Sequence, residues 1–348
     1  MKKTVTTLAD GRELIYYDAR DDAARDAVDP RPLTPVVSRS EIRYDELTGD
    51  PVAIASHRQA RTYQPPADAC PLCPGGDGHE SEIPAAGYEV AVFENRFPSL
   101  SGGFGRCEVV CFTDDHTASF ADLTEEQARL VLDAWTDRTA ELSALPGIKQ
   151  VYCFENRGQE IGVTLPHSHG QIYAFPYVTP RTARMRSRLD EHRAATGRNL
   201  FDDVVARERT DGERVVLETE HWIAFVPYAA HWPYEVHLYP TRRVPDLLAL
   251  DEAARTEFAQ VYLELLRRFD RLFGPDEPPT PYIAAWHQAP FTDERREDFG
   301  LHLELFSVRR ASGKLKFLAG TESGMGAFMN DVRPEDAARR IREVATNR

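Results

Sequence analysis

The order of predicted elements occurs twice along this chain of 348 residues. Two strand-like runs, a long helical stretch and two further strand-like runs follow one another in each half. In the first half these elements lie at 89–94, 105–112, 124–145, 150–156 and 166–173. In the second half they lie at 222–227, 233–238, 251–273, 281–287 and 301–306. Residue-by-residue similarity is weak, but a repeated order indicates two copies of one unit. Strands paired in succession with one long helix per unit predict an α+β fold, with mainly antiparallel sheets flanked by helices.

The helical stretches carry their own start signals. Thr124 and Gln127 have the spacing of a capping box, and acidic residues follow Thr124 in the first turn. Apolar residues then recur at helical spacing until Pro146. The second long helix has a similar stripe, and Pro334 is suited to open a helix near the C-terminus. We interpret both stripes as core positions.

Length and local composition suggest the domain boundaries. A prior of roughly 150 residues per domain predicts two domains. We expect an N-terminal extension at 1–40, an N-terminal unit at 41–190 and a C-terminal unit at 191–348. The extension looks peripheral, with one short strand from Leu14 to Tyr17 and a charged, Pro-rich linker. Residues 177–214 are basic and helical, and we interpret their arginines as a solvated helix face.

Charge and composition exclude several classes of partner. A formal net charge of −14 opposes binding to nucleic acid or to an anionic membrane surface. No apolar run reaches the roughly 18 residues of a membrane span, and the N-terminus lacks the apolar core of a signal peptide. The five cysteines are an odd number in a long chain, which favours a reducing compartment. The sequence therefore predicts a cytoplasmic protein.

The most informative short motif is His167-Ser168-His169-Gly170-Gln171. Positions two apart on a strand face the same side, so both imidazoles or their supporting groups would converge. Gly170 would let a substrate approach the backbone closely. Gln171 supplies a neutral amide donor suited to a charged oxygen. From the residues alone, two unrelated surface histidines on a polar turn remain an equal alternative.

Two further groups of residues suggest ligands. Cys70 and Cys73 form a C-x-x-C knuckle rich in turn residues, which suits tetrahedral zinc better than a thioredoxin motif. His116 and His167 could complete a Cys2His2 set, although two reduced surface thiols are the alternative. Arg58 and Arg61 follow a predicted strand and could hold phosphates. By spacing alone, solvated surface arginines are the better interpretation.

Taken together, these motifs resemble a known family, the galactose-1-phosphate uridylyltransferases. That family is a branch of the histidine-triad superfamily built from two such units. The segments that carry the resemblance are 154–158, 166–172, 218–222, 286–291 and 316–322. The resemblance runs from about Glu41 to the C-terminus, and its motifs stand in the family's order.

The resemblance implies an exchange within galactose metabolism. UDP-glucose and galactose 1-phosphate would give glucose 1-phosphate and UDP-galactose in two ping-pong steps. His169 would attack the α-phosphorus and carry UMP covalently. A largely neutral imidazole needs no separate base, and its other nitrogen must be held as N–H by a fixed acceptor. In the family that acceptor is the backbone carbonyl of the residue matching His167, and Gln171 would donate to a phosphoryl oxygen.

Further roles are implied position by position. Cys70, Cys73, His116 and His167 match the family's ligands for a structural zinc. The residues that match the nucleotide and phosphate region are Arg58, Arg61, Asn95, Phe97, Asn156 and Thr164. Lys316, Phe317 and Glu322 match a loop that reaches the active site of a partner subunit, so a homodimer is implied.

Three departures from the family pattern stand out. Ser168 occupies a position where proline is commoner. Arg96 stands where the family often has an acidic residue at the uridine ribose. Some members bind a second metal in the C-terminal half through a glutamate and three histidines. Here His287 and His302 remain and Glu304 replaces the third histidine, so a second metal is not predicted.

Two alternatives stay open. One is a related nucleotidyltransferase or phosphorylase of the superfamily that uses another base, such as adenine, or another hexose phosphate. The other is a zinc-stabilised protein that binds a sugar nucleotide without catalysis, which His169 and Gln171 argue against.

Overall fold

The structure is a computed structural model that describes residues 1–35, 40–57, 65–76 and 78–346. It divides into two compact units. The first comprises Met1–Phe154, Thr164–Met185 and Pro290–Glu294, and the second comprises Glu155–Val163, Arg186–Ala289 and Arg295–Arg348. The boundaries predicted at residues 40 and 190 stay predictions. Among the described residues, no helix combines the length and the apolar composition that a membrane crossing needs.

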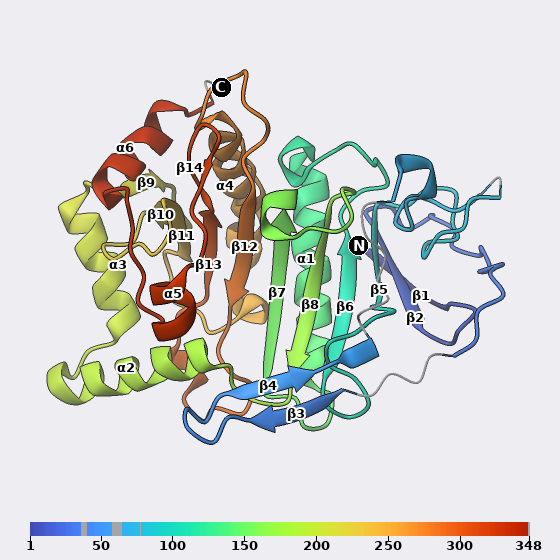
Figure 1. The fold of residues 1–348 in the computed structure, drawn as a ribbon, viewed down its shortest axis with the longest axis horizontal. Coiled ribbons are helices and arrows are strands. Elements are labelled where there is room, and N and C mark those ends of the chain that lie inside the picture. The colour runs from blue at the N-terminus through green and yellow to red at the C-terminus, as the bar shows by residue number, and fades with distance from the viewer. Residues whose placement is uncertain (36–39, 58–64, 77, 347–348) are drawn as a thin grey trace. The chain divides into compact units, whose positions relative to one another are not determined.

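The first unit is built on an antiparallel sheet (Figure 1). Its strands are β1 (Lys2–Thr7), β2 (Glu13–Asp18), β5 (Val90–Glu94), β6 (Arg106–Cys111), β7 (Gln150–Arg157) and β8 (His169–Phe175). The order across the sheet is β1-β2-β5-β6-β8-β7. A separate hairpin joins β3 (Glu41–Tyr44) and β4 (Pro51–Ile54).

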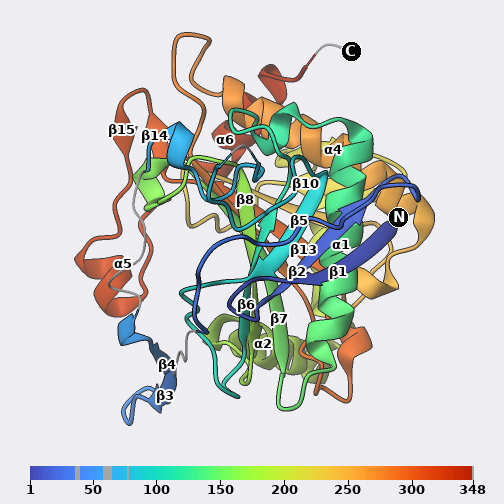
Figure 2. The same ribbon diagram turned by 90° about the vertical axis from the view of Figure 1, so that its right-hand side faces the viewer.

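Helix α1 (Glu125–Ser143) packs against β2, β5 and β8, and Figure 2 shows it along one side of these strands. The predicted capping box is confirmed. The backbone N–H of Gln127 donates to Oγ1 of Thr124 at 3.2 Å, and the backbone N–H of Thr124 donates to Oε1 of Gln127 at 2.9 Å. Between the helix and the sheet, the ring of Phe112 contacts those of Phe120 and Trp135, at centroid distances of 5.0 and 5.8 Å.

The N-terminal strand is not peripheral, contrary to expectation. The predicted strand is present as β2, but it lies inside the sheet, between β1 and β5. All four residues from Leu14 to Tyr17 are buried. A run without polar alternation is typical of a strand covered on both faces. The pairing partner β5 is far away in the sequence, so local pattern could not place the strand.

The second unit repeats the strand order of the first. Its strands are β9 (Val215–Glu218), β10 (Trp222–Phe225), β11 (Tyr234–Pro240), β12 (Tyr282–His287) and β13 (His302–Ser307), and a small hairpin joins β14 (Arg309–Ala311) to β15 (Lys314–Leu315). The order β10-β11-β13-β12 corresponds to β5-β6-β8-β7. The expected α+β fold with two similar, mainly antiparallel units is therefore confirmed.

The remaining helices are α2 (Pro180–Thr196), α3 (Leu200–Asp211), α4 (Glu252–Arg271), α5 (Gly320–Met325) and α6 (Pro334–Glu343). The long helix α4 is the counterpart of α1. Asp251 caps it by accepting from the backbone N–H of Ala254 at 2.9 Å. Helix α6 begins at the expected proline and packs against α4, β9 and β11.

Candidate functional site

Strand β8 places His169 and Gln171 in one cavity. Antiparallel pairing with β6 sets His169 opposite Cys111 and Gln171 opposite Val109. Because alternate residues of a strand share a face, both side chains line a cavity of about 300 Å³. We call this space the His169 cavity. Its other walls in the first unit include Leu72, Phe93, Asn95, Phe97 and Thr164.

One hydrogen bond fixes the tautomer of His169. Its Nδ1 donates to the backbone carbonyl oxygen of His167 at 2.7 Å. The proton is therefore held on Nδ1, and the lone pair is left on Nε2. Burial lowers the pKa of His169, and the bond to the carbonyl of His167 opposes that shift without cancelling it. The ring is consequently neutral near pH 7, which is the form that can act as a nucleophile.

Gly170 faces away from the cavity, toward the helix side of the sheet. A Cβ atom at this position would lie 2.7 Å from Cζ of Phe112 and 2.9 Å from the carbonyl oxygen of Phe154. The glycine is therefore required by packing against Phe112. The sequence interpretation, close approach of a substrate, gave a different reason for the same residue, because strand alternation turns Gly170 to the opposite face.

Gln171 is oriented by its neighbour on the same face. The hydroxyl of Tyr173 donates to Oε1 of Gln171 at 3.3 Å. With its oxygen accepting, the amide of Gln171 can offer its NH₂ group to an occupant of the cavity. Asn95 is similar, because its Oδ1 accepts the backbone N–H of Phe97 at 2.8 Å. Both amides are neutral donors suited to phosphate or hydroxyl oxygens.

The four predicted metal ligands lie together. Sγ of Cys73 is 3.3 Å from Nδ1 of His116 and 3.5 Å from Nδ1 of His167, and Sγ of Cys70 is 3.9 Å from Nδ1 of His167. All four donor atoms lie within 4.8 Å of one another. A tetrahedral zinc site with Zn–S of about 2.3 Å and Zn–N of about 2.0 Å separates sulfur from nitrogen by about 3.5 Å. The set fits zinc in donor type and in spacing.

The surroundings of this Cys2His2 cluster support a metal. Nε2 of His167 donates to the carbonyl oxygen of Thr113 at 2.8 Å, which leaves Nδ1 free to face the cysteines. Without a cation, burial and the neighbouring Cys70 raise the pKa of Cys73 to about 12. Two thiolates at such close range need a cation to stabilise them. The cluster also holds His167, whose carbonyl orients His169.

The structure distributes the other predicted residues as follows. Asn95, Phe97 and Thr164 line the His169 cavity. Arg58 and Arg61 lie outside the described residues. Asn156 lies in the second unit, in the last part of β7.

The predicted subunit-crossing residues also lie in the second unit. Nζ of Lys316 donates to Oε1 of Glu322 at 2.9 Å. This bond to Lys316 lowers the pKa of Glu322 to about 2. Phe317, in contrast, is 73% exposed. Lys316, before α5, is thus paired with Glu322 on α5, and the ring of Phe317 between them is exposed.

A second group of possible ligands lies in the second unit. Glu304 is 3.3 Å from Nε2 of His287, 3.6 Å from Nε2 of His302 and 3.7 Å from Nε2 of His237. These histidines satisfy the buried carboxylate of Glu304, and its pKa is held well below the ordinary value by His287 and His237 despite burial. The donor atoms of His287, His302 and Glu304 all lie within 4.8 Å of one another.

The sequence did not point to several of the residues that line the His169 cavity. Phe93 shares a strand face with Asn95, Leu72 stands inside the C-x-x-C knuckle, and Val109 pairs with Gln171. Strand alternation around Asn95 could have indicated Phe93. Arg31 and Glu82 also line the cavity, and no local motif marks either of them.

Known proteins show close similarity to this chain. Family models match residues 101–179, as the galactose-1-phosphate uridyl transferase N-terminal domain, and residues 185–348, as the C-terminal domain. A galactose-1-phosphate uridylyltransferase of Streptomyces lividans is 65% identical, over 99% of this chain and 98% of that protein. One of Thermotoga maritima is 38% identical, over 87% of this chain and 98% of that protein. A solved uridylyltransferase structure superimposes with a TM-score of 0.77 at 32% identity, covering 87% of this chain and 98% of the other. The chain therefore belongs to the galactose-1-phosphate uridylyltransferase family.

Proposed function

We propose that this nucleotidyltransferase moves UMP from UDP-glucose to galactose 1-phosphate through a uridylyl group on Nε2 of His169. The observation that carries the proposal is the 2.7 Å bond from Nδ1 of His169 to the carbonyl of His167. That bond selects Nε2 as the attacking atom and orients it from a rigid strand. Gln171, on the same face, provides the donor that a phosphoryl transfer needs.

The first step forms one bond and breaks another. The lone pair of Nε2 attacks the α-phosphorus of UDP-glucose, and the bond from that phosphorus to the bridging oxygen breaks. Glucose 1-phosphate leaves with the electron pair. The imidazole then carries a positive charge, which the Nδ1–H bond to the carbonyl of His167 stabilises. Galactose 1-phosphate reverses these events and takes the UMP, so no free base is required.

Gln171 would act on the transferred phosphoryl group. The charge on the nonbridging oxygens changes as the phosphorus passes through its transition state. A fixed amide donor stabilises that charge without carrying a proton of its own that could titrate. Arg58, Arg61, Asn95, Phe97, Asn156 and Thr164 are proposed to hold the nucleotide and its phosphates.

The proposed resident metal is a structural zinc ion held by Cys70, Cys73, His116 and His167. When bound, this ion would cross-link the C-x-x-C knuckle to the segment before β8. His167 would then be fixed by its ring while its carbonyl orients the nucleophile. We also propose that the chain works in the cytoplasm as a homodimer in which Lys316, Phe317 and Glu322 reach the partner's site.

An exchange assay tests this function. UDP-glucose and galactose 1-phosphate are supplied to the wild-type chain, to His169→Ala and to His192→Ala, a control on α2 whose ring pairs with Asp203. Wild type and the control should produce UDP-galactose, and His169→Ala should not. Turnover by His169→Ala would contradict the mechanism. Faster turnover of ADP-glucose than of UDP-glucose would support the adenine-nucleotide alternative.

A further inference from the structure

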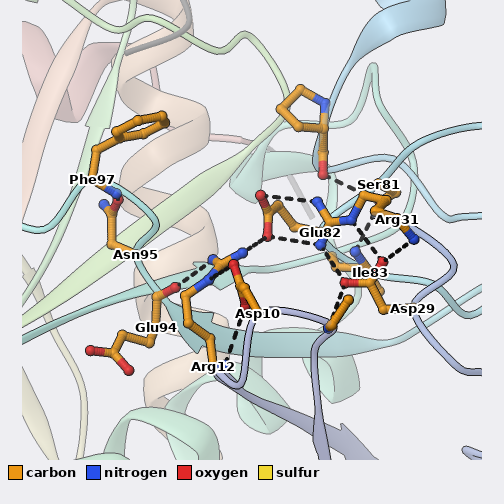
Figure 3. Close-up of polar contacts among 12 residues, drawn as sticks. Asp10, Arg12, Asp29, Arg31, Ser81, Glu82, Ile83, Glu94, Asn95 and Phe97 are labelled. Atoms are coloured by element: carbon orange, nitrogen blue, oxygen red, sulfur yellow. Dashed lines mark hydrogen bonds and ion pairs between the residues drawn. The ribbon is translucent and has the colours of Figure 1, made fainter. Parts of the chain in front are cut away.

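One wall of the His169 cavity is an ion pair that sequence motifs do not mark. Arg31 and Glu82 both line the cavity, and Nη1 of Arg31 is 3.1 Å from Oε1 of Glu82. Both residues are buried, with relative exposures of 7%. They lie 51 positions apart, and both are outside the segments matched by the family models. Figure 3 shows this pair together with Asn95 and Phe97.

The N-terminal segment holds this pair in place. Nε and Nη2 of Arg31 donate to the carboxylate of Asp29 at 2.8 and 2.7 Å. Nη2 of Arg12 donates to Oε2 of Glu82 at 2.6 Å, and Nη1 of Arg12 donates to the carbonyl of Glu94 at 2.9 Å. Glu94 immediately precedes Asn95, so the same guanidinium links the ion pair to the loop that carries Asn95.

The pair keeps unused hydrogen-bonding capacity. The side-chain hydrogen bonds of Arg31 use Nε and Nη2. Within the part of the chain that the structure describes, its Nη1 makes only the ion-pair contact with Glu82. An Nη group has two N–H bonds, so at least one can serve an occupant of the cavity. On Glu82, Oε2 already accepts from Nη2 of Arg12 and from Nη2 of Arg31. Among the described residues, Oε1 contacts only Nη1 of Arg31, which leaves one of its two lone pairs for an occupant of the cavity. The wall therefore offers a donor and an acceptor side by side.

A nucleoside is the occupant that matches these groups. The ribose diol donates hydroxyl hydrogens, which a carboxylate accepts, and the base presents carbonyl oxygens, which a guanidinium can bind. The apolar walls formed by Leu72, Phe93 and Val109 suit the faces of a base. A buried ion pair is costly to desolvate, and replacement by apolar side chains is often neutral for stability. Retaining one in a cavity wall is consistent with a role in binding.

We infer that Arg31 and Glu82 bind the nucleoside part of the nucleotide donor, and that Arg12 and Asp29 act as positioning residues for them. The N-terminal segment is then part of the substrate site. This inference depends on the proposed function only in taking a uridine nucleotide as the ligand. It assigns a role to a segment whose sequence looks peripheral.

Binding of UMP to the purified full chain, measured by calorimetry, tests the inference without requiring turnover. Arg31→Lys keeps the charge for Asp29 and Glu82 but loses the planar fork, so a single ammonium cannot serve Asp29, Glu82 and an occupant of the cavity in the same geometry. Arg25→Lys is the matched control. Arg25 lies in the same segment, pairs with Asp18 and packs on Tyr16, and is not among the residues that line the cavity. Arg31→Lys should weaken UMP binding about 10- to 100-fold, as expected for a lost charge-assisted hydrogen bond, and Arg25→Lys should not.

Kinetics provide the second readout. In Arg31→Lys and Glu82→Gln the KM for UDP-glucose should rise, while kcat at saturating UDP-glucose should stay near the wild-type value. Arg12→Lys should also raise the KM without lowering kcat, but by a smaller factor. Attack by galactose 1-phosphate on preformed uridylyl-enzyme should change little, because the nucleoside is then covalently attached.

Equal UMP affinity in Arg31→Lys, Arg25→Lys and the wild type would overturn the inference. Equal loss of affinity in both lysine variants would also overturn it, because the effect would then be structural. Failure of the proposed function has a different signature. The wild-type chain would not become uridylylated by UDP-glucose, whatever its affinity for UMP.

Discussion

At the scale of single residues, the proposed transfer requires the imidazole of His169 to be unprotonated at Nε2. Nδ1 of His169 is held as a donor by the carbonyl of His167, and burial lowers the pKa of the ring. A lowered pKa means that the ring becomes protonated only at a pH below the ordinary histidine range. The attacking lone pair is therefore available throughout the neutral range.

The rate of uridylylation should consequently fall on the acid side of its pH profile only. We expect the first-step rate with UDP-glucose to be flat near neutral pH and to fall as the pH drops below an apparent pKa under about 6.5. Rapid-quench measurement of this half-reaction avoids titration of galactose 1-phosphate. An acid limb centred above pH 7 would contradict a buried, neutral His169.

Replacing Gln171 should slow the chemistry without unfolding the chain. Loss of a preorganised donor typically costs about 10²–10³-fold in rate, so we expect this fall in kcat for Gln171→Ala. Tyr173→Phe is the matched control. It removes only the hydroxyl that orients Gln171, and its effect should be about tenfold at most. An unchanged kcat in Gln171→Ala would contradict a contact between Gln171 and the reacting group.

Single-residue roles could be predicted where they depend on local pattern. The pair His169 and Gln171 could be predicted because strand alternation is local, and Cys70 and Cys73 because a C-x-x-C knuckle carries its own geometry. His116 and His167 lie 43 and 94 positions from Cys73, so the knuckle alone marked them only as candidates. Arg31 and Glu82 could not be predicted. Their meeting depends on where the N-terminal segment runs after β2, which no periodicity encodes.

At the scale of elements, the two faces of β8 lie in different environments. His169 and Gln171 face the cavity, and Gly170 between them faces Phe112. The second unit contains a related strand. Nδ1 of His302 donates to the carbonyl of Gly300 at 2.8 Å, as Nδ1 of His169 does to that of His167.

This bond identifies His302 as the counterpart of His169, and Glu304 as the counterpart of Gln171. Aligned from their first residues, the predicted runs 166–173 and 301–306 instead set Glu304 against His169, which is a shift of two residues. A shift of two preserves the alternation of a strand, so pattern alone could not detect it. His302 differs from His169 in its accessibility. Its ring is buried and stacks on the rings of Tyr239 and His287, at centroid distances of 4.8 and 4.9 Å, so a substrate cannot reach it as it can reach His169.

Gly170→Ala should destabilise the first unit. A methyl group would meet Phe112 and the carbonyl of Phe154 at distances below 3 Å, and overpacking of this kind typically costs about 1–3 kcal/mol. Gly324→Ala on α5 is the control, because its Cβ would have no heavy atom within 4 Å among the described residues. Urea denaturation of both variants measures the difference. Equal unfolding free energies would contradict the packing role of Gly170.

At the scale of the whole molecule, the zinc ion proposed at the Cys2His2 cluster would link stability to activity. The cluster joins the knuckle at Cys70 and Cys73 to His167, which lies in the segment just before β8. A ligand that binds only the folded chain stabilises it by about 3 kcal/mol at a hundred times its Kd. The loss of zinc should therefore be visible in the melting temperature.

Chelation of the wild-type chain should lower the melting temperature by several degrees, and added zinc should restore it. Cys73→Ser should melt at the lower temperature and should not respond to the chelator, since its site is already broken. Metal analysis accompanies both melts. A wild-type melt that is unchanged by complete removal of zinc would contradict a structural metal.

The most direct test of the central claim is the intact mass of the chain after incubation with UDP-glucose alone. The account predicts that the wild-type chain gains one uridylyl group, that His169→Ala gains none, and that galactose 1-phosphate removes the group and yields UDP-galactose. A wild-type mass that never changes, under conditions in which exchange proceeds, would contradict the covalent mechanism.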